Sequence, residues 1–191
     1  TYTLTPSRTF TPTFTPTPAL RIGSTQVSKI DGMVLMYVPA GDFLMGSDLD
    51  DNEQPVHLVT HDAFWIDKFE VTNTMYAQCV KAGRCLAPSQ KSSAKNSSYY
   101  GNSQFDNYPV INVSWDNANV YCEWANRQLP TEAQWEKAAR GSDERIYPWG
   151  SVAPDKSKLN YTNNVGDTTE VGQYPSGASP YGALDMAGNV L

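Results

Sequence analysis

The C-terminal part of this chain, residues 147–191, shows little hydrophobic periodicity and many turn-forming residues. Glycine, asparagine, aspartate and proline recur every few positions, so neither a long helix nor a series of regular strands fits it. A segment of this length stays ordered only when aromatic packing, tight turns or a bound cation holds it in place. The feature predicts an irregular, loop-rich domain and argues against a helical bundle or a parallel doubly wound sheet.

The N-terminal residues 1–20, TYTLTPSRTFTPTFTPTPAL, form a low-complexity Thr/Pro-rich stretch. Proline fixes φ and removes amide donors, so we predict an extended stalk or disordered linker that lies outside the fold. Thr/Pro-rich stalks are typical of exported proteins, which makes an extracytoplasmic or cell-surface location the expectation. Residues 21–32 are expected to be a lead-in, and residues 33–191 a single domain.

Charge and hydropathy exclude some classes of partner. The net charge is −6 and no basic run occurs, so the sequence has no nucleic-acid footprint. No apolar stretch in the sequence is long enough to span a membrane. The acidic cluster Asp48, Asp50, Asp51 and Glu53 is interpreted as a solvated loop rather than a cation site.

Three short segments predict strands. MVLMYVPAG (33–41) is an apolar run that ends in a turn signal, and DFLMG (42–46) follows it directly. AFWIDKFEV (63–71) alternates apolar and polar residues at several positions. Residues 86–110 are polar and rich in serine and asparagine, so they predict a long surface loop.

Capping signals predict three helices. Thr72 is a cap for a helix to about Ala82, and Gly83 follows as a stop. Ser114 begins a second helix to about Arg127. The third, residues 131–140, has the clearest start, because Thr131-Glu-Ala-Gln fits a capping box, and Gly141 follows its end.

The three cysteines fall into two groups. Cys79 and Cys85 are close in sequence and predict a local disulfide, which an exported location would keep oxidised. Cys122 lies on the apolar face of the second predicted helix and is expected to be buried. His57 and His61 have the spacing of ligands on one face of a strand, but no third ligand is evident, so an ordinary polar strand face is the preferred interpretation.

Seven segments together resemble the formylglycine-generating enzyme, or sulfatase-modifying factor, superfamily. In family order they are VPAGDFLMGS (38–47), EQPVH (53–57), FWIDKFEVTN (64–73), YPVINVSWDNANVYCEWAN (108–126), LPTEAQWEKAARG (129–141), YPWG (147–150) and GDTTEVGQYPSGASPYGALDMAGNV (166–190). Each segment alone is modest evidence, whereas seven in register are specific.

This resemblance implies an α+β fold with little regular secondary structure, related to C-type lectins, of which residues 33–191 would be the incomplete N-terminal two-thirds. Active members oxidise a substrate cysteine to formylglycine with copper bound by two cysteines in the C-terminal third, so copper is expected only there. We expect the parent protein to act on a protein or peptide substrate such as a sulfatase, and this fragment alone to lack the catalytic cysteines. The alternative is a non-catalytic lectin-like recognition domain, attached in some proteins to a signalling kinase.

The resemblance also implies calcium sites. The first would use the side chains of Asn160 and Asp167 and the carbonyls of Tyr161 and Thr169. Its two side-chain oxygens are expected about 3–4 Å apart around the ion. The alternative is that Asn160 and Asp167 only form turns, as these residue types often do.

A second site would use Asp185 with the carbonyls of Gly188 and Val190, and it is incomplete in this sequence.

The tryptophans are expected in the core; they are Trp65, Trp115, Trp124, Trp135 and Trp149. Because the rest of the family fold normally covers the second and third helices, exposed apolar surface is expected beside them.

Overall fold

The computed structural model describes residues 19–161 and 164–190. Most of the predicted stalk, residues 1–18, lies outside the described residues. The regular elements are, in chain order, β1 Thr25–Val27, β2 Val34–Val38, β3 Gly41–Met45, β4 His57–His61, β5 Phe64–Asp67, α1 Asn73–Lys81, α2 Trp115–Trp124 and α3 Glu132–Arg140, with short 3₁₀ turns at Asp51–Glu53, Ser103–Phe105 and Pro175–Gly177. This mixture of short helices and antiparallel strands confirms the predicted α+β class.

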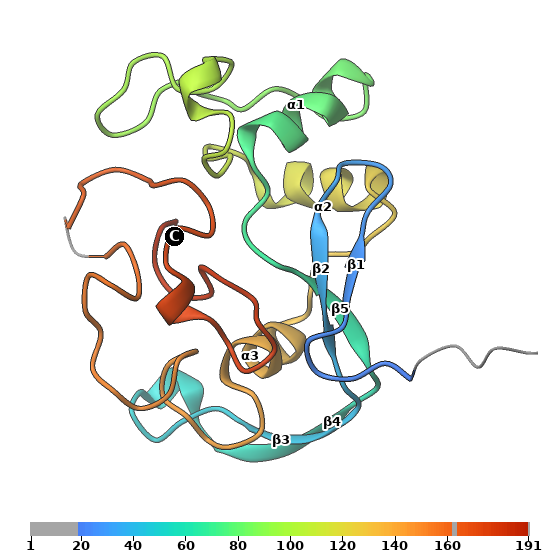
Figure 1. The fold of residues 1–191 in the computed structure, drawn as a ribbon, viewed down its shortest axis with the longest axis vertical. Helices are drawn as coiled ribbons and strands as arrows, with labels where there is room; N and C mark the ends of the chain where they lie inside the picture. The colour runs from blue at the N-terminus through green and yellow to red at the C-terminus, as the bar shows by residue number, and fades with distance from the viewer. Residues whose placement is uncertain (1–18, 162–163, 191) are drawn as a thin grey trace, which may run out of the picture.

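Two small antiparallel sheets form the β part of the fold. The first has the strand order β1-β2-β5, and the second pairs β3 with β4. In the first sheet Met36 lies opposite Thr25 on one side and Ile66 on the other. In the second, Phe43 lies opposite Val59. Figure 1 shows β3 and β4 at one end of the molecule, and α1 and α2 near the other.

All three helices begin at the predicted caps. The side chains of Thr72, Ser114 and Thr131 each accept a hydrogen bond from a main-chain N–H in the first turn of their helix. At α3 both bonds of the capping box are present, because the Gln134 side chain also accepts from the Thr131 N–H. These bonds satisfy donors that a helix start otherwise leaves free.

The core consists of two clusters. One joins the first sheet to α3 and the C-terminal loops; its buried members are Met36, Val38, Ile66, Ala138, Ala139, Tyr181, Ala183 and Met186. The other joins α1 to α2; its buried members are Tyr76, Cys79, Cys85, Tyr121, Cys122 and Ala125. The loop-rich C-terminal region is therefore held partly by aromatic and apolar packing, as its composition predicts.

The structure corrects several boundaries. The predicted lead-in contains β1, and the strand predicted over 63–71 is limited to β5. The second helix ends at Trp124 instead of Arg127, because Asn126 takes a left-handed conformation with φ 58°. Beyond that point the chain leaves the helical path, and this places Arg127 beside the sheet, where it pairs with Asp67.

The prediction that every tryptophan lies in the core is wrong for two of them. Trp115 is 70% exposed and Trp135 is 47% exposed. Trp115 is the first residue of α2 and Trp135 is the fourth residue of α3, and neither belongs to the two core clusters. Trp65, Trp124 and Trp149 are half-buried. The apolar surface expected beside the second and third helices is therefore present.

Candidate metal-binding region, pocket and groove

Asn160 and Asp167, which supply the two side chains of the first predicted calcium site, meet through the main chain of Asp167. Asn160 is buried, and its Nδ2 donates to the main-chain carbonyl of Asp167 at 2.7 Å. Thr169 is also buried, and its N–H and hydroxyl both donate to Asn189 Oδ1, at 2.8 and 3.0 Å. Tyr161 lies at the exposed end of this region.

The carboxylate of Asp167 faces a different loop. Its Oδ2 accepts from the Ser93 hydroxyl at 2.6 Å, the Lys95 N–H at 3.0 Å and the Asn96 side-chain amide at 2.9 Å. Burial alone would raise the pKa of Asp167, but these bonds, with one from the Thr168 N–H, outweigh it and lower that pKa. To bind a calcium ion together with Asn160, the Asp167 carboxylate would therefore have to give up some of these hydrogen bonds and coordinate the ion instead. The calcium ligands stay a prediction.

The second predicted set surrounds a buried pair of carboxyl groups. Asp185, at φ 53°, accepts from the Gly172 N–H at 2.5 Å and shares a hydrogen bond with Glu70. Asn189 donates its Nδ2 to Glu70 Oε1 at 3.0 Å. Burial raises the pKa of Glu70 to about 8, with Asp185 adding to the effect, and burial also raises the pKa of Asp185. The two groups therefore hold a proton between them near neutral pH.

Gly188 and Val190, the other residues of this set, lie within one turn, in which the Val190 N–H donates to the Gly188 carbonyl at 2.9 Å. Glu70 was not predicted as part of this region, since it is more than one hundred residues away in sequence. Among residues 19–161 and 164–190, no three histidine, cysteine or acidic side chains cluster as a metal site would require.

The cysteine predictions are confirmed. Cys79 and Cys85 form a disulfide with a Cα–Cα distance of 5.3 Å, and Cys122 is a buried free thiol. Burial raises the pKa of Cys122 to about 11, with the nearby Asp67 adding to it, so the thiolate is disfavoured at neutral pH. Two sulfurs bonded to each other and one buried thiol do not fit thiolate ligation of copper.

The two histidines lie on β4, at opposite ends of the strand. His57 Nδ1 lies 2.8 Å from the Pro55 carbonyl oxygen. The His61 ring packs between Phe43 and Phe64, with centroid distances of 6.3 and 6.2 Å. His61 therefore packs between an aromatic residue of each sheet, and is not part of the ordinary polar strand face that the sequence predicted.

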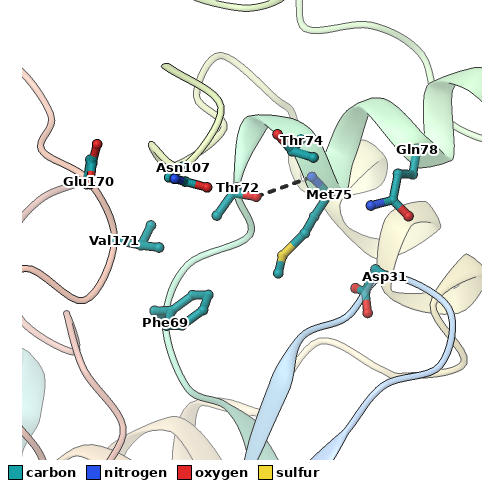
Figure 2. A pocket seen from close by; sticks show the side chains of 9 residues that line it. All are labelled: Asp31, Phe69, Thr72, Thr74, Met75, Gln78, Asn107, Glu170 and Val171. Carbon is teal, nitrogen blue, oxygen red and sulfur yellow. Dashed lines mark hydrogen bonds between the residues drawn. The ribbon is translucent and has the colours of Figure 1, made fainter. Parts of the chain in front are cut away.

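A small pocket of about 350 Å³ opens beside the start of α1. Figure 2 shows its lining from four segments, with Phe69, Thr72 and Met75 in the middle and Asp31 and Glu170 on opposite sides. The dashed line marks the bond from the Met75 N–H to the Thr72 hydroxyl, which caps α1. The volume is at the lower end for small-molecule sites.

Asp31, one of the two acidic residues that line this pocket, is already paired. Asp31 accepts from Arg127 Nη2 and the Tyr121 hydroxyl, each at 2.6 Å. Burial would raise the pKa of Asp31, but hydrogen bonds from Arg127, Ser28 and Tyr121 hold it well below its usual range. Arg127 also lies 3.2 Å from Asp67, where burial outweighs the attraction and raises the pKa of the Asp67 carboxyl to about 6. The charge of Asp31 is therefore neutralised within the protein, and Glu170 is the other carboxylate that a ligand in this pocket would meet.

A larger groove of about 1220 Å³ follows β5 and the exposed sides of α2 and α3, and we call it the β5 groove. It is lined by Gln26, Leu35, residues 64–67, residues 69–71, Trp115, Asn119, Cys122, Glu123, residues 126–131, Gln134, Trp135 and residues 184–186. Both exposed tryptophans thus lie on one surface, together with the Asp67–Arg127 pair and the Glu70–Asp185 pair.

Comparison with known proteins gives one family. A family model described as sulfatase-modifying factor enzyme 1-like domain matches residues 20–191. The serine/threonine-protein kinase pkn1 of Chlamydia caviae is 34% identical over 168 residues, which cover 82% of this chain and 26% of the kinase. The formylglycine-generating enzyme of Mus musculus is 30% identical over 212 residues, which cover 82% of this chain and 56% of that enzyme.

The solved structure of PvdO from Pseudomonas aeruginosa has the same fold. It superposes with a TM-score of 0.69 at 24% identity and covers 88% of this chain and 72% of that chain. The chain thus spans about a quarter of the kinase relative and about half of the mouse enzyme. No helix in the described part of the chain is long and apolar enough to cross a membrane.

Proposed function

Because the chain belongs to the sulfatase-modifying factor enzyme 1-like family, we propose that the protein carrying this domain oxidises a cysteine of a protein or peptide substrate to formylglycine. The observation that supports the proposal is the match over residues 20–191, together with 30% identity to a formylglycine-generating enzyme. The reaction would convert the substrate CH2–SH group to an aldehyde and release its sulfur as hydrogen sulfide. Dioxygen would take two electrons from the substrate and two from an added thiol reductant, so that one oxygen atom enters the aldehyde and the other leaves as water.

The described residues would contribute scaffold and substrate surface to this reaction, not its metal chemistry. Copper in such enzymes needs two reactive cysteines, whereas Cys79 and Cys85 are joined in a disulfide and Cys122 is buried. We therefore derive no catalytic step from the cysteines of this chain, and we expect residues 1–191 alone to be inactive.

The test compares residues 1–191 with the full-length parent protein on a cysteine peptide taken from a sulfatase. We expect copper-dependent loss of the thiol and gain of an aldehyde only with the parent, detected by mass spectrometry and hydrazide labelling. A parent variant with its metal-binding cysteines replaced by alanine is the matched control. Peptide oxidation by residues 1–191 alone would contradict the expectation that these residues are inactive by themselves. A folded parent that gives no aldehyde would contradict the proposed activity.

A second candidate is a non-catalytic recognition domain attached to a signalling kinase. The observation that favours it is the match to pkn1, in which the region similar to this chain is only a quarter of the kinase. A parent protein that contains a kinase domain and no further paired cysteines would support this alternative.

We also propose that the region around Asn160 and Asp167 binds calcium. Asp167 carries the one charged side chain of this set, so we expect modest affinity and a melting temperature that rises with calcium. Thermal unfolding of the full-length parent, with calcium and with a chelator, measures this change in melting temperature. Asp167→Ala should abolish the rise.

The matched control for calcium is Asp155→Ala, since Asp155 is an exposed carboxylate in the same loop region that pairs with Lys158. This variant should keep the calcium response. If calcium and chelator leave the melting curve of the parent unchanged, Asn160 and Asp167 are ordinary turn residues.

An extracytoplasmic location of the parent is part of the same proposal. The Cys79–Cys85 disulfide and the Thr/Pro-rich N-terminal residues 1–20 support it, because disulfides persist mainly in oxidising compartments.

A further inference from the structure

The carboxylate of Asp167 holds a distant surface loop, residues 91–98, which we call the latch loop. Its Oδ2 accepts hydrogen bonds from the Ser93 hydroxyl at 2.6 Å, the Lys95 N–H at 3.0 Å and Asn96 Nδ2 at 2.9 Å. The three donors lie in one turn, in which the Ser93 N–H donates to the Asn96 carbonyl at 2.8 Å. A turn that aims several donors at one point binds an anion, and here the anion is this carboxylate.

A second contact joins the latch loop to the same part of the C-terminal region. Lys95 Nζ donates to the Val165 carbonyl. Gly166, the next residue, has φ 75°, and a Cβ atom there would overlap the Lys95 side chain. The absence of a side chain at Gly166 therefore leaves the space in which Lys95 lies against the main chain.

The middle of the latch loop depends on this attachment. Its two ends are fixed by hydrogen bonds with Tyr99 and Asn112. Between the ends, the hydrogen bonds from residues 93–97 to other segments in the described part of the chain all go to Asp167 or Val165. Most of these loop residues are exposed. The segment should therefore open locally when the carboxylate is withdrawn.

The same carboxylate is the charged group of the proposed calcium region, and the two roles conflict. Asn160 lies on the main-chain side of Asp167, where Asn160 Nδ2 donates to the Asp167 carbonyl at 2.7 Å. The carboxylate instead faces the latch loop. A carboxylate is a rigid planar group, so turning either oxygen toward an ion beside Asn160 also moves Oδ2 away from its donors.

We propose that calcium and the latch loop compete for the Asp167 carboxylate, so that calcium binding releases residues 91–98 from the C-terminal region. The inference rests on the proposed calcium binding and adds its regulation. Competition is reciprocal, because a ligand that weakens the hold on the loop is itself weakened by the loop to the same extent. A variant with a weaker latch should therefore bind calcium more tightly, whereas a loop that only positioned the carboxylate for the ion would give the opposite result.

Isothermal titration calorimetry of the full-length parent with calcium chloride tests the competition. Ser93→Ala removes the shortest of the three bonds to Asp167 Oδ2, so calcium should bind about tenfold more tightly than to the native protein. Asn96→Ala removes another of these bonds and should act in the same direction. Ser97→Ala is the matched control, because Ser97 is an exposed serine of the same loop that is not among the donors to Asp167, and it should leave the affinity unchanged.

Hydrogen exchange followed by mass spectrometry gives a second readout on the native parent. The Lys95 N–H is one of the donors to Asp167, so a peptide that contains residues 93–97 should exchange about tenfold faster at saturating calcium. A peptide from α3, Glu132–Arg140, is the internal control and should keep its exchange rate.

The outcomes separate this inference from the proposal on which it rests. If neither the native parent nor any variant binds calcium, the calcium proposal fails and the latch fails with it. If the native parent binds calcium but Ser93→Ala and Asn96→Ala bind it equally or more weakly, the loop does not compete, while the calcium site stands. Calcium binding that leaves exchange of residues 93–97 unchanged would likewise overturn the release of the loop.

Discussion

Replacement of Arg127 with methionine is expected to lower the free energy of unfolding by about 3–5 kcal/mol, the cost of leaving a buried charge without its partner. The side chain of Asp31 has no exposed surface and faces Arg127 Nη1 and Nη2 at 3.1 and 2.6 Å. Methionine keeps most of the apolar volume but supplies no positive charge. Urea denaturation followed by circular dichroism measures the loss.

The matched control is Arg145→Met. Arg145 pairs with Asp143, whose side chain is 60% exposed, so its ion pair should contribute only about 0–1 kcal/mol. Adding Asp31→Asn to Arg127→Met should recover part of the loss, since it removes the buried charge. Equal losses in the Arg127 and Arg145 variants would show that the Asp31–Arg127 pair is not the structural link we describe.

The same variant has a characteristic pH dependence. In the native chain the pKa of Asp31 is held below the ordinary value of 3.8, so its stabilisation is present above that pH and is lost as the pH falls below it. Without Arg127 the effect of burial is opposed only by the hydrogen bonds from Ser28 and Tyr121, so the pKa of Asp31 should be higher than in the native chain and its stabilisation at neutral pH smaller. The difference between the two proteins should therefore be larger at neutral pH than at about pH 4.

The parts of the fold that sequence predicts well are those with local causes. The capping side chains of Thr72, Ser114 and Thr131 lie within three residues of the amides they bind. A few consecutive residues therefore contain all the information needed to predict each helix start. The Cys79–Cys85 pair is local in the same sense, with a sequence separation of 6. By contrast, β1 has only three residues, too few to show a period.

The parts that sequence does not predict depend on contacts between distant segments. Arg127 meets Asp31 across 96 residues, and nothing near either one indicates the other. Glu70 and Asn189 are 119 residues apart, yet they share a hydrogen bond. The exposure of Trp115 and Trp135 likewise depends on what other segments cover, which residue type alone does not reveal.

The C-terminal turn that carries Gly188 is fixed by its fit against Asn160. The Asn189 N–H donates to the Asn160 carbonyl at 2.9 Å, so the main chains of the two segments touch. Gly188 has φ 78°, and a Cβ atom there would overlap the same Asn160 carbonyl. The proposed calcium region and the second set of predicted ligands are thus joined through a contact that only glycine permits.

Gly188→Ala is expected to lower the free energy of unfolding by about 3 kcal/mol, combining left-handed strain of about 1–2 kcal/mol with overpacking of about 1–3 kcal/mol. The overlap cannot be relieved by a side-chain rotation, because the obstacle is main chain. Gly101→Ala is the matched control, since Gly101 has φ 85° and open space around its Cα. It should show the strain cost alone. Urea denaturation of both variants decides the point: equal losses would mean that the Gly188–Asn160 contact does not hold the C-terminal turn in place.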